Sequence, residues 1–418
     1  MADISTCPPM TRASVVEAHS LIQPFIHRTP VLTNHTIDQF ASTPRTAEEL
    51  KGTPWEIKDD STATTTPAKP VLRLWFKCEN LQRIGAFKSR GAFHAVERLK
   101  REPGWEAGGG FDKGVVTHSS GNHAQALALA ARTAGMPAHI VMPKIAAPPK
   151  VAATRGYGAN VYFSGSTAPE RLAVSEKVIA ETGARMVPPY DHPDIILGQG
   201  TAGLELQEQV AEAMAMSMAA STATTSTTIG AQPTALLRAP TTVTADKPSQ
   251  STGLDAMMTP CGGGGLLAGT VLSAQGTGIR VFGAEPSFEG ADDCTRGLAQ
   301  GKRIEAVSSL TIADGLRTPV GVHNWAVLTG DTPESKGQGV HGVYAVGEDQ
   351  IRAALRLLLE RMKLVVEPSS AVPLAVVLFN EDFRRRVEEE AGPAGWDLGI
   401  VLSGGNVSLE GFSKLFPS

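Results

Sequence analysis

The chain has 418 residues, of which 42% are hydrophobic and 19% charged, a composition typical of a globular protein of about two to three domains. The net charge of -4 and the lack of a basic stripe with interleaved aromatics give no support to nucleic-acid binding. No run reaches the roughly 18 apolar residues of a membrane helix, and residues 1–22 lack the apolar core of a secretory signal. Four widely spaced cysteines without a CxxC pair indicate reduced thiols. We therefore expect a cytoplasmic protein with no membrane or nucleic-acid partner.

Short apolar runs alternate with helical patterns along the chain. In chain order we predict a strand at 72–78, a helix at 89–99, a strand at 114–118, a helix at 122–134, strands at 139–142 and 160–163 with a helix between them, and strands at 254–261, 280–285 and 399–403. This alternation is typical of βαβ units and predicts an α/β fold with largely parallel sheets.

Two stretches interrupt this pattern. Residues 213–253 are rich in Ser, Thr, Ala and Pro, and residues 56–69 have a similar composition. Such segments bury little apolar surface, so we interpret most of 213–253 as a disordered surface insertion and 56–69 as a smaller one.

The first motif with chemical content is the turn Gly-Ala-Phe-Lys, which ends in Lys88 and opens a helix. The electropositive N-terminus of a helix disfavours an ammonium group and lowers the pKa of the lysine. A neutral amine is what Schiff-base chemistry requires. Alternatively, the lysine is simply solvated at the helix start.

The second motif is the segment Ser119-Ser120-Gly-Asn122-His123, which links a strand to a helix. Its hydroxyls, its amide and the unpaired backbone N–H groups of a helix N-terminus form a ready site for a carboxylate. Alternatively, the serines only cap the helix.

The third motif is a run of four glycines, Gly262 to Gly265, again between a strand and a helix. Successive glycines let backbone N–H groups surround a phosphate. A dinucleotide fingerprint is the rival interpretation, because Gly263, Gly265 and Gly269 are followed by Glu285 at the end of the next strand. The spacing is one residue too long for that fingerprint, so a phosphate cradle is favoured.

Two further segments, VVEPSSA at 365–371 and VLSGGNVSL at 401–409, complete the set. The five motifs in this order, with IHRTPVLT at 26–33 and GQGTAGLELQEQ at 198–209, resemble the serine racemases and serine/threonine dehydratases among the pyridoxal-phosphate enzymes of the tryptophan-synthase-β-like class. The resemblance covers nearly the whole chain except the two insertions. It implies two open, twisted, mostly parallel sheets flanked by helices, with the cofactor between a large domain (1–111 and 191–418) and a small domain (112–190).

The resemblance also implies roles for individual residues. Lys88 would hold the cofactor as a Schiff base and exchange protons at Cα, Asn122 would bind the 3-oxygen of the ring, and Ser403 would face the pyridine nitrogen. Phe87 would pack near the ring, Gly262, Gly263, Gly264 and Gly265 would hold the phosphate, and Ser119, Ser120 and His123 would lie at the substrate carboxylate. Ser120 would serve as the acid or base on the second face of the substrate, as in the racemase branch.

The racemase branch further implies a divalent cation. Glu285, the carbonyl of Ala291 and Asp293 would be its ligands, with Glu289 as a substitute because the spacing is longer than in the family pattern. Ligands that are all oxygen suit Mg²⁺, Ca²⁺ or Mn²⁺. Alternatively, these acids are merely solvated.

These inferences predict a homodimeric serine racemase and L-serine or L-threonine ammonia-lyase that converts a hydroxy amino acid to a 2-oxo acid and ammonia. A 3-hydroxyaspartate ammonia-lyase is the alternative within the family. Two rival classes remain open at this point: a non-catalytic amino-acid-binding protein on the same fold, and a nicotinamide-dependent oxidoreductase that uses the glycine loop.

Overall fold

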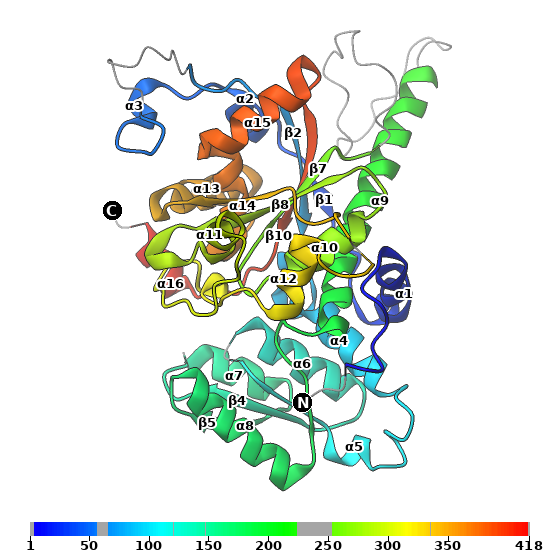
Figure 1. Cartoon of the computed structure of the whole chain (residues 1–418). Helices are drawn as coiled ribbons and strands as arrows, with labels where there is room; N and C mark the ends of the chain where they lie inside the picture. Colours follow the sequence, from blue (N-terminus) through cyan, green and yellow to red (C-terminus); the bar gives the residue numbers. More distant parts are fainter. Residues whose placement is uncertain are drawn as a thin grey trace.

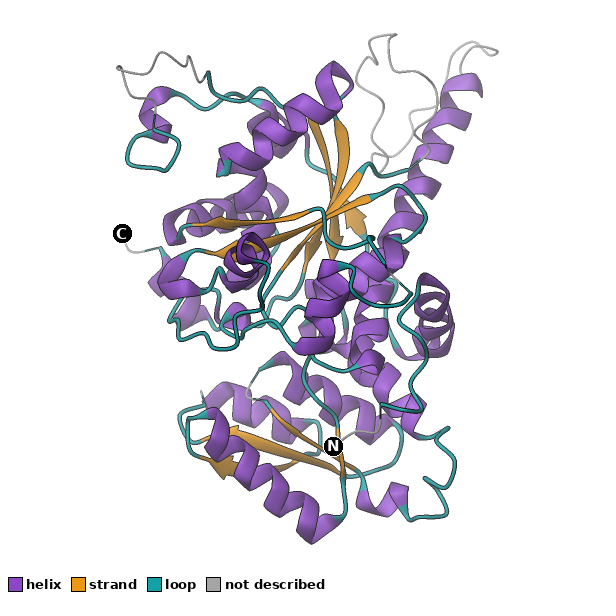
Figure 2. Cartoon of the chain, viewed as in Figure 1, coloured by secondary structure: helices purple, strands orange, loops and turns teal. Residues whose placement is uncertain are grey.

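The structure is a computed structural model that describes residues 4–56, 66–119, 121–146, 148–223, 253–334 and 336–416. It contains two sheets, which Figure 2 shows as two groups of strands, one above the other. The larger sheet has six strands in the order β1-β2-β10-β7-β8-β9, and the smaller has four in the order β5-β4-β3-β6. β1 pairs antiparallel with β2, and every other pairing in the two sheets is parallel. The α/β fold with two mostly parallel sheets is thus confirmed.

The elements have the following bounds. The strands are β1 Val31–Leu32, β2 Leu72–Cys78, β3 Val115–His118, β4 Ala138–Pro143, β5 Asn160–Ser164, β6 Arg185–Met186, β7 Ala256–Pro260, β8 Arg280–Pro286, β9 Gly342–Val346 and β10 Trp396–Leu402. The helices are α1 Arg12–Ile22, α2 His35–Ser42, α3 Ala47–Leu50, α4 Lys88–Leu99, α5 Gly110–Lys113, α6 Asn122–Thr133, α7 Pro148–Gly156, α8 Ala168–Thr182, α9 Pro193–Ala223, α10 Gly265–Ala274, α11 Asp293–Gln300, α12 Val322–Thr329, α13 Glu348–Met362, α14 Pro368–Phe379, α15 Glu381–Ala391 and α16 Leu409–Leu415.

The larger sheet is covered on both faces. α13 and α14 pack on one face in one hydrophobic cluster, and α1, α9 and α10 form the other cluster. β10, at the middle of the sheet, is buried at every residue, and α14 is apolar nearly all round, as expected of elements enclosed on all sides.

Helices α9 and α10 approach each other closely because both carry glycine at the contact. A Cβ atom on Gly200 would lie 2.5 Å from the carbonyl oxygen of Gly269. A larger residue at either position would push the helices apart, so the glycines of the GQGTAG and LLAG segments are explained by packing.

Helix α4 connects the two sheets. It packs against α9, on the large sheet, and against α6, on the small sheet, as the central region of Figure 1 shows. Its first residue is Lys88. The site around Lys88 therefore lies where the two sheet layers meet.

The region after 212 differs from the sequence-based expectation. α9 continues to Ala223, so residues 213–223 are helical and the predicted insertion from 213 begins too early. Alanine, methionine and glutamate in AEAMAMSMAA favour helix even where the side chains are exposed, as at Met216 and Met218. The rest of that predicted insertion lies almost wholly outside the described residues, as does most of 56–69. Within the described parts of the chain, no helix is both long and apolar enough to cross a membrane.

Candidate active site

Lys88 lies on a turn that is tied to the end of β10. The backbone N–H of Phe87 donates to the carbonyl of Ser403 at 3.0 Å, and Ala86 forms a β-bridge with Gly404. Asn406 Nδ2 donates to the carbonyl of Ile84 at 2.7 Å. Ile84 has a φ of 59°, which is rare for a β-branched residue and costs on the order of 1–3 kcal/mol. The Ser-Gly-Gly-Asn segment therefore holds the lysine turn in a strained conformation.

The amine of Lys88 is partly buried. Its Nζ donates to the carbonyl of Pro189 at 2.8 Å and lies 5.1 Å from the centre of the Phe87 ring. Burial lowers the pKa of Lys88 to about 8, and the nearby charge of Glu367 opposes this shift. Burial is thus the main cause of the low pKa, whereas the sequence argument relied on the helix N-terminus. At pH 7 about a tenth of the amine is then neutral, far more than in a solvated lysine.

Glu367 is a site residue to which the sequence analysis gave no role. Its carboxylate accepts from Asn122 Nδ2 at 3.1 and 3.2 Å, and Asn122 Oδ1 accepts from Asn406 Nδ2 at 2.8 Å. Burial and then the charge of Asp314 raise the pKa of Glu367 to about 7. The sequence signal that could have identified Glu367 is an acid between an apolar run and the proline in VVEPSSA. Glu367 fixes the orientation of Asn122, the residue expected at the 3-oxygen of the cofactor.

The glycine loop joins β7 to α10. Gly264 has a φ of +89°, and a Cβ on Gly263 would lie 2.5 Å from the Tyr190 ring. The carbonyl of Gly263 accepts from Asn324 Nδ2 at 2.6 Å, which fixes the loop. Gly265 opens α10, and the first turn of a helix offers N–H groups that suit an anion. Gly262, the first glycine of the loop, lies against the backbone of Leu316. The loop can therefore receive a phosphate group.

Ser403 directly follows β10, and its side chain is buried. Its Oγ lies 3.0 Å from Ser370 Oγ, and Ser370 Oγ donates to the carbonyl of Gly404 at 2.7 Å. Either hydroxyl can be the donor in the contact between them, so Ser403 can also turn its proton elsewhere. Ser403 therefore presents a neutral hydroxyl, not a charge.

The residues predicted to bind the substrate carboxylate lie in the segment after β3. Ser119 Oγ accepts from the backbone N–H of Gly121 at 3.3 Å. His123 is buried; its Nε2 lies 3.3 Å from the carbonyl of Val187, and its Nδ1 has no hydrogen-bond partner among the described residues. Burial, together with the charge of Lys88, lowers the pKa of His123 to about 3, so the ring is neutral. Ser120 lies outside the described residues.

Glu285, at the end of β8, is fully buried. Its carboxylate accepts from the backbone N–H groups of Cys294 at 3.0 Å and Thr295 at 2.9 Å, and from the Thr295 hydroxyl at 2.8 Å. Burial and then the charge of Asp293 raise the pKa of Glu285 to about 8.

Asp293, the second acid of this group, is also buried. Oδ2 accepts from the backbone N–H of Val320 at 3.0 Å, whereas Oδ1 has no hydrogen-bond partner in the parts of the chain that are described. Ala291 is buried in the same segment. Glu289 instead accepts from the backbone N–H of Leu310 at 2.8 Å. A cation would neutralise the two buried acids and use the unpaired oxygen of Asp293, so these residues fit the expected site.

A partly neutral buried lysine, a glycine loop at a helix start and a buried serine at a strand end define a site suited to an aldehyde cofactor with a phosphate. The chain matches a family described as pyridoxal-phosphate dependent enzymes over residues 62–247 and 248–392. The protein belongs to this family of pyridoxal-phosphate dependent enzymes. The dinucleotide interpretation of the glycine loop is therefore not needed.

Individual relatives narrow the comparison. The chain is 35% identical to a serine racemase of Dictyostelium discoideum, with 97% of this chain and 98% of the relative covered. It is 32% identical to an L-threo-3-hydroxyaspartate ammonia-lyase of Saccharomyces cerevisiae, with 97% and 96% covered. The crystal structure of the Dictyostelium discoideum serine racemase superposes with a TM-score of 0.69, covering 96% of this chain and 99% of that one. The chain is thus similar to racemases and ammonia-lyases over nearly its full length.

Proposed function

We propose that the protein is a pyridoxal-phosphate dependent amino-acid racemase and ammonia-lyase that acts on serine and related β-hydroxy amino acids. The observation that carries this proposal is the largely desolvated amine of Lys88, which lies at the meeting point of β10, α4 and the segment before α9. The full-length similarity to serine racemases supports the substrate class.

The residues around Lys88 have distinct proposed tasks. Lys88 would hold the cofactor and move the proton of the substrate Cα on one face. Bound pyridoxal phosphate withdraws electrons from that carbon and makes its proton acidic. Asn122, oriented by Glu367, would position the ring at its 3-oxygen. Gly262, Gly263, Gly264 and Gly265 would hold the phosphate, and Phe87 would pack near the ring.

Ser403 would face the pyridine nitrogen. A hydroxyl cannot keep that nitrogen protonated as a carboxylate would, so negative charge that develops on the substrate is less stabilised. This favours departure of the β-hydroxyl together with removal of the Cα proton, and release of a 2-oxo acid and ammonia.

Racemisation needs an acid or base on each face of the substrate, and Lys88 serves only one. We propose Ser120 for the other face, with Ser119 and His123 at the substrate carboxylate. In Ser120→Ala, formation of D-serine from L-serine should collapse, whereas release of the 2-oxo acid from L-serine persists. Equal loss of both activities, or no D-serine from the unaltered enzyme, would exclude the racemase part of the proposal.

A second candidate, 3-hydroxyaspartate ammonia-lyase, is favoured by two relatives that carry this name, at 32% and 31% identity. The two candidates differ in whether the pocket must accept a second carboxylate. Rates of 2-oxo acid release from L-serine, L-threonine and L-threo-3-hydroxyaspartate, measured side by side, decide between them. A preference for hydroxyaspartate by a factor of roughly 10 or more, about 1.4 kcal/mol, would select the second candidate.

We further propose that Glu285, the carbonyl of Ala291 and Asp293 bind Mg²⁺, Ca²⁺ or Mn²⁺. Chelation should lower the melting temperature, and added Mg²⁺ should restore it, because an ion that binds only the folded state stabilises it by about 2.7 kcal/mol at 100 times its Kd. Asp293→Asn should weaken this response. Identical melting with and without the ion, on protein shown to be metal-free, would rule out the site.

The organisation of the chain completes the proposal. We propose that residues 112–190 form the small domain, that 1–111 and 191–418 form the large domain, and that the small domain closes over the substrate and excludes water. The strands β3 to β6 all lie within 112–190. A cytoplasmic homodimer is part of the same proposal, and sedimentation of the purified protein tests the dimer.

A further inference from the structure

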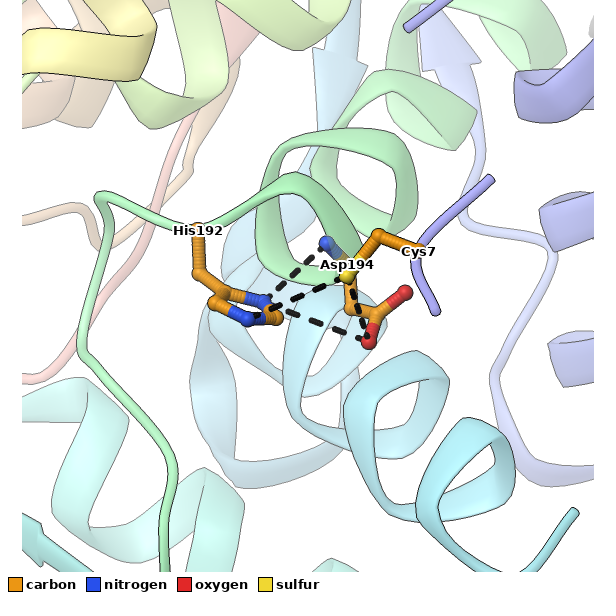
Figure 3. A group of neighbouring side chains, drawn as sticks. All are labelled: Cys7, His192 and Asp194. Atoms are coloured by element: carbon orange, nitrogen blue, oxygen red, sulfur yellow. Dashed lines mark hydrogen bonds and ion pairs between the residues drawn. The ribbon is translucent and has the colours of Figure 1, made fainter. Parts of the chain in front are cut away.

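A group of three potential metal ligands lies outside the site around Lys88. Cys7 belongs to the segment before α1, His192 precedes α9, and Asp194 is in its first turn. Figure 3 shows the three side chains pointing toward one another. Cys7 Sγ lies 3.7 Å from Asp194 Oδ2 and 3.9 Å from His192 Nε2, and one donor atom of each residue lies within 4.8 Å of the other two.

These distances are close to those of a tetrahedral metal site. Metal bonds of about 2.3 Å to sulfur and about 2.0–2.1 Å to nitrogen and oxygen place the ligand atoms about 3.3–3.6 Å apart. The observed separations exceed this by only a few tenths of an ångström for the two pairs that include Cys7. Small side-chain rotations would therefore bring the three atoms to one ion.

Burial lowers the pKa of His192 to about 4, so its imidazole is neutral. Burial raises the pKa of Cys7 to about 12 and that of Asp194 to about 6, so a bound ion has to displace the thiol proton. His192 and Asp194 are buried, whereas Cys7 is only partly buried, which leaves a way in for an ion. Arg98 Nε contacts Asp194 Oδ1 at 3.5 Å and so leaves Oδ2 turned toward Cys7. A carboxylate ligand held by a neighbouring group is a usual feature of metal sites.

We propose that Cys7, His192 and Asp194 form a second cation site that takes a borderline-soft divalent ion such as Zn²⁺. A thiol, an imidazole and one carboxylate suit Zn²⁺ or Co²⁺ far better than Mg²⁺ or Ca²⁺. This separates the site chemically from Glu285 and Asp293, where the expected ligands are all oxygen.

Binding has two consequences. The ion displaces the Cys7 thiol proton, which passes to the solvent, and the Cys7 sulfur becomes a thiolate ligand. Coordination through His192 Nε2 places the ring proton on Nδ1, which ends the 3.3 Å hydrogen bond from the backbone N–H of Asp194 and requires a small rotation of the ring.

The site would join the N-terminal segment to the start of α9. The segment that enters α9 also contains Pro189, whose carbonyl accepts from Lys88 Nζ. An ion at Cys7 would thus fasten the segment around Cys7 onto the connection between the two sheets. We expect Zn²⁺ to slow proteolytic removal of the N-terminal segment.

The test uses the full-length holoenzyme, stripped of metal and kept in excess Mg²⁺ so that the oxygen site is occupied. Co²⁺ is then added, because a tetrahedral site with a thiolate gives intense visible bands that an octahedral oxygen site does not. The unaltered protein should bind one Co²⁺ with these bands. Cys7→Ser and His192→Asn should each lose the bands and weaken binding by at least roughly 10-fold.

Two matched variants serve as controls. Cys78→Ser alters a buried thiol outside the group and should keep the bands. Cys294→Ser tests a second group of potential metal ligands, which consists of Cys261, Glu285 and Cys294. This second group shares Glu285 with the proposed Mg²⁺ site. Bands that survive in Cys7→Ser with unchanged affinity, or that disappear only in Cys294→Ser, would overturn the proposal. None of these outcomes depends on racemase or lyase activity.

Discussion

Two lysines, the buried Lys77 and the partly buried Lys88, have pKa values lowered to about 8, yet their surroundings differ. Lys77 Nζ donates to the carbonyl of Thr29 at 2.7 Å and to Gln209 Oε1 at 2.6 Å, and it lies 3.4 Å from Glu205. Among the described residues, Lys88 Nζ donates one hydrogen bond, to the carbonyl of Pro189, and it lies against the Phe87 ring.

The acids around the two lysines differ as well. Glu205 and Glu79 are both bound by Arg90, at 2.6 and 2.7 Å, so the region of Lys77 is a closed network of paired charges. Glu367 is the acid whose charge acts on the pKa of Lys88. Its carboxylate accepts a hydrogen bond from the Asn122 amide and is not paired in this way with an arginine. A lowered lysine pKa therefore does not identify a reactive lysine by itself. Lys88 differs from Lys77 because its amine has a single hydrogen-bond partner among the described residues and because it opens helix α4.

The largest effect should follow from Lys88→Ala. Turnover of serine should fall by at least roughly 10²–10⁴-fold, because the residue that holds the cofactor and moves the Cα proton is removed. The free energy of unfolding of the cofactor-free protein should stay within about 1 kcal/mol, since the substitution removes a partly buried amine with one hydrogen bond among the described residues. Steady-state kinetics measure the fall in turnover, and urea denaturation measures the free energy of unfolding. Near-normal turnover would refute the role of Lys88.

Lys77→Met should show the reverse pattern. Removal of one member of a buried charge network leaves Glu205 less compensated and should cost roughly 3–5 kcal/mol of unfolding free energy. Turnover per folded molecule should change far less than in Lys88→Ala. The measurement is urea denaturation together with kinetics at a temperature where the variant is folded. A stable but inactive Lys77→Met protein would break the comparison.

Glu367→Gln sharpens the comparison through pH. The pKa of Glu367 is raised from 4.5 to about 7 in the folded state, so the folded protein holds this proton more tightly than the unfolded chain. Its contribution to stability is present below pH 4.5 and is lost as the pH rises through 7. Relative to the variant, the unaltered apoprotein should lose up to about 3 kcal/mol between these limits. A difference in unfolding free energy that does not vary with pH would contradict this assignment.

The smallest effect concerns the segment after α9. α9 supplies Glu205 and Gln209 to Lys77 and ends at Ala223, so a deletion within 227–250 leaves both lysine regions intact. Because loop closure entropy changes slowly with length, the free energy of unfolding should change by no more than about 1 kcal/mol. Thermal melting and kinetics measure the outcome. An inactive or insoluble deletion protein would assign a function to this segment.

The order of the five motifs predicted the family and the α/β fold, and both are confirmed. Strands that are mostly apolar, such as β2 and β10, could be predicted from the sequence because β10 is buried throughout and β2 at most of its positions. β1 and β6 have two residues each, and β9 is an edge strand that is half-exposed, so their local patterns are too weak to predict.

Contacts between segments that are far apart in the sequence could not be predicted either. Glu367 meets Asn122 across 245 positions of the chain, and Cys7 meets His192 across 185. Composition and periodicity report on neighbours along the chain, so neither group could be assembled from them. The end of α9 is different, because the Ala- and Met-rich stretch after 212 carried a helical signal that the Ser- and Thr-rich residues beyond it obscured.

The most direct test of the account is borohydride reduction of the purified holoenzyme, which fixes the cofactor to the amine that holds it. Peptide mapping should then find pyridoxal phosphate on Lys88 at close to one equivalent per chain, with none on Lys77. Prior incubation with serine should lower that labelling, because the substrate competes for the cofactor. Label on Lys77 or another lysine, or no bound cofactor at all, would contradict the central claim that Lys88 is the reactive lysine of this site.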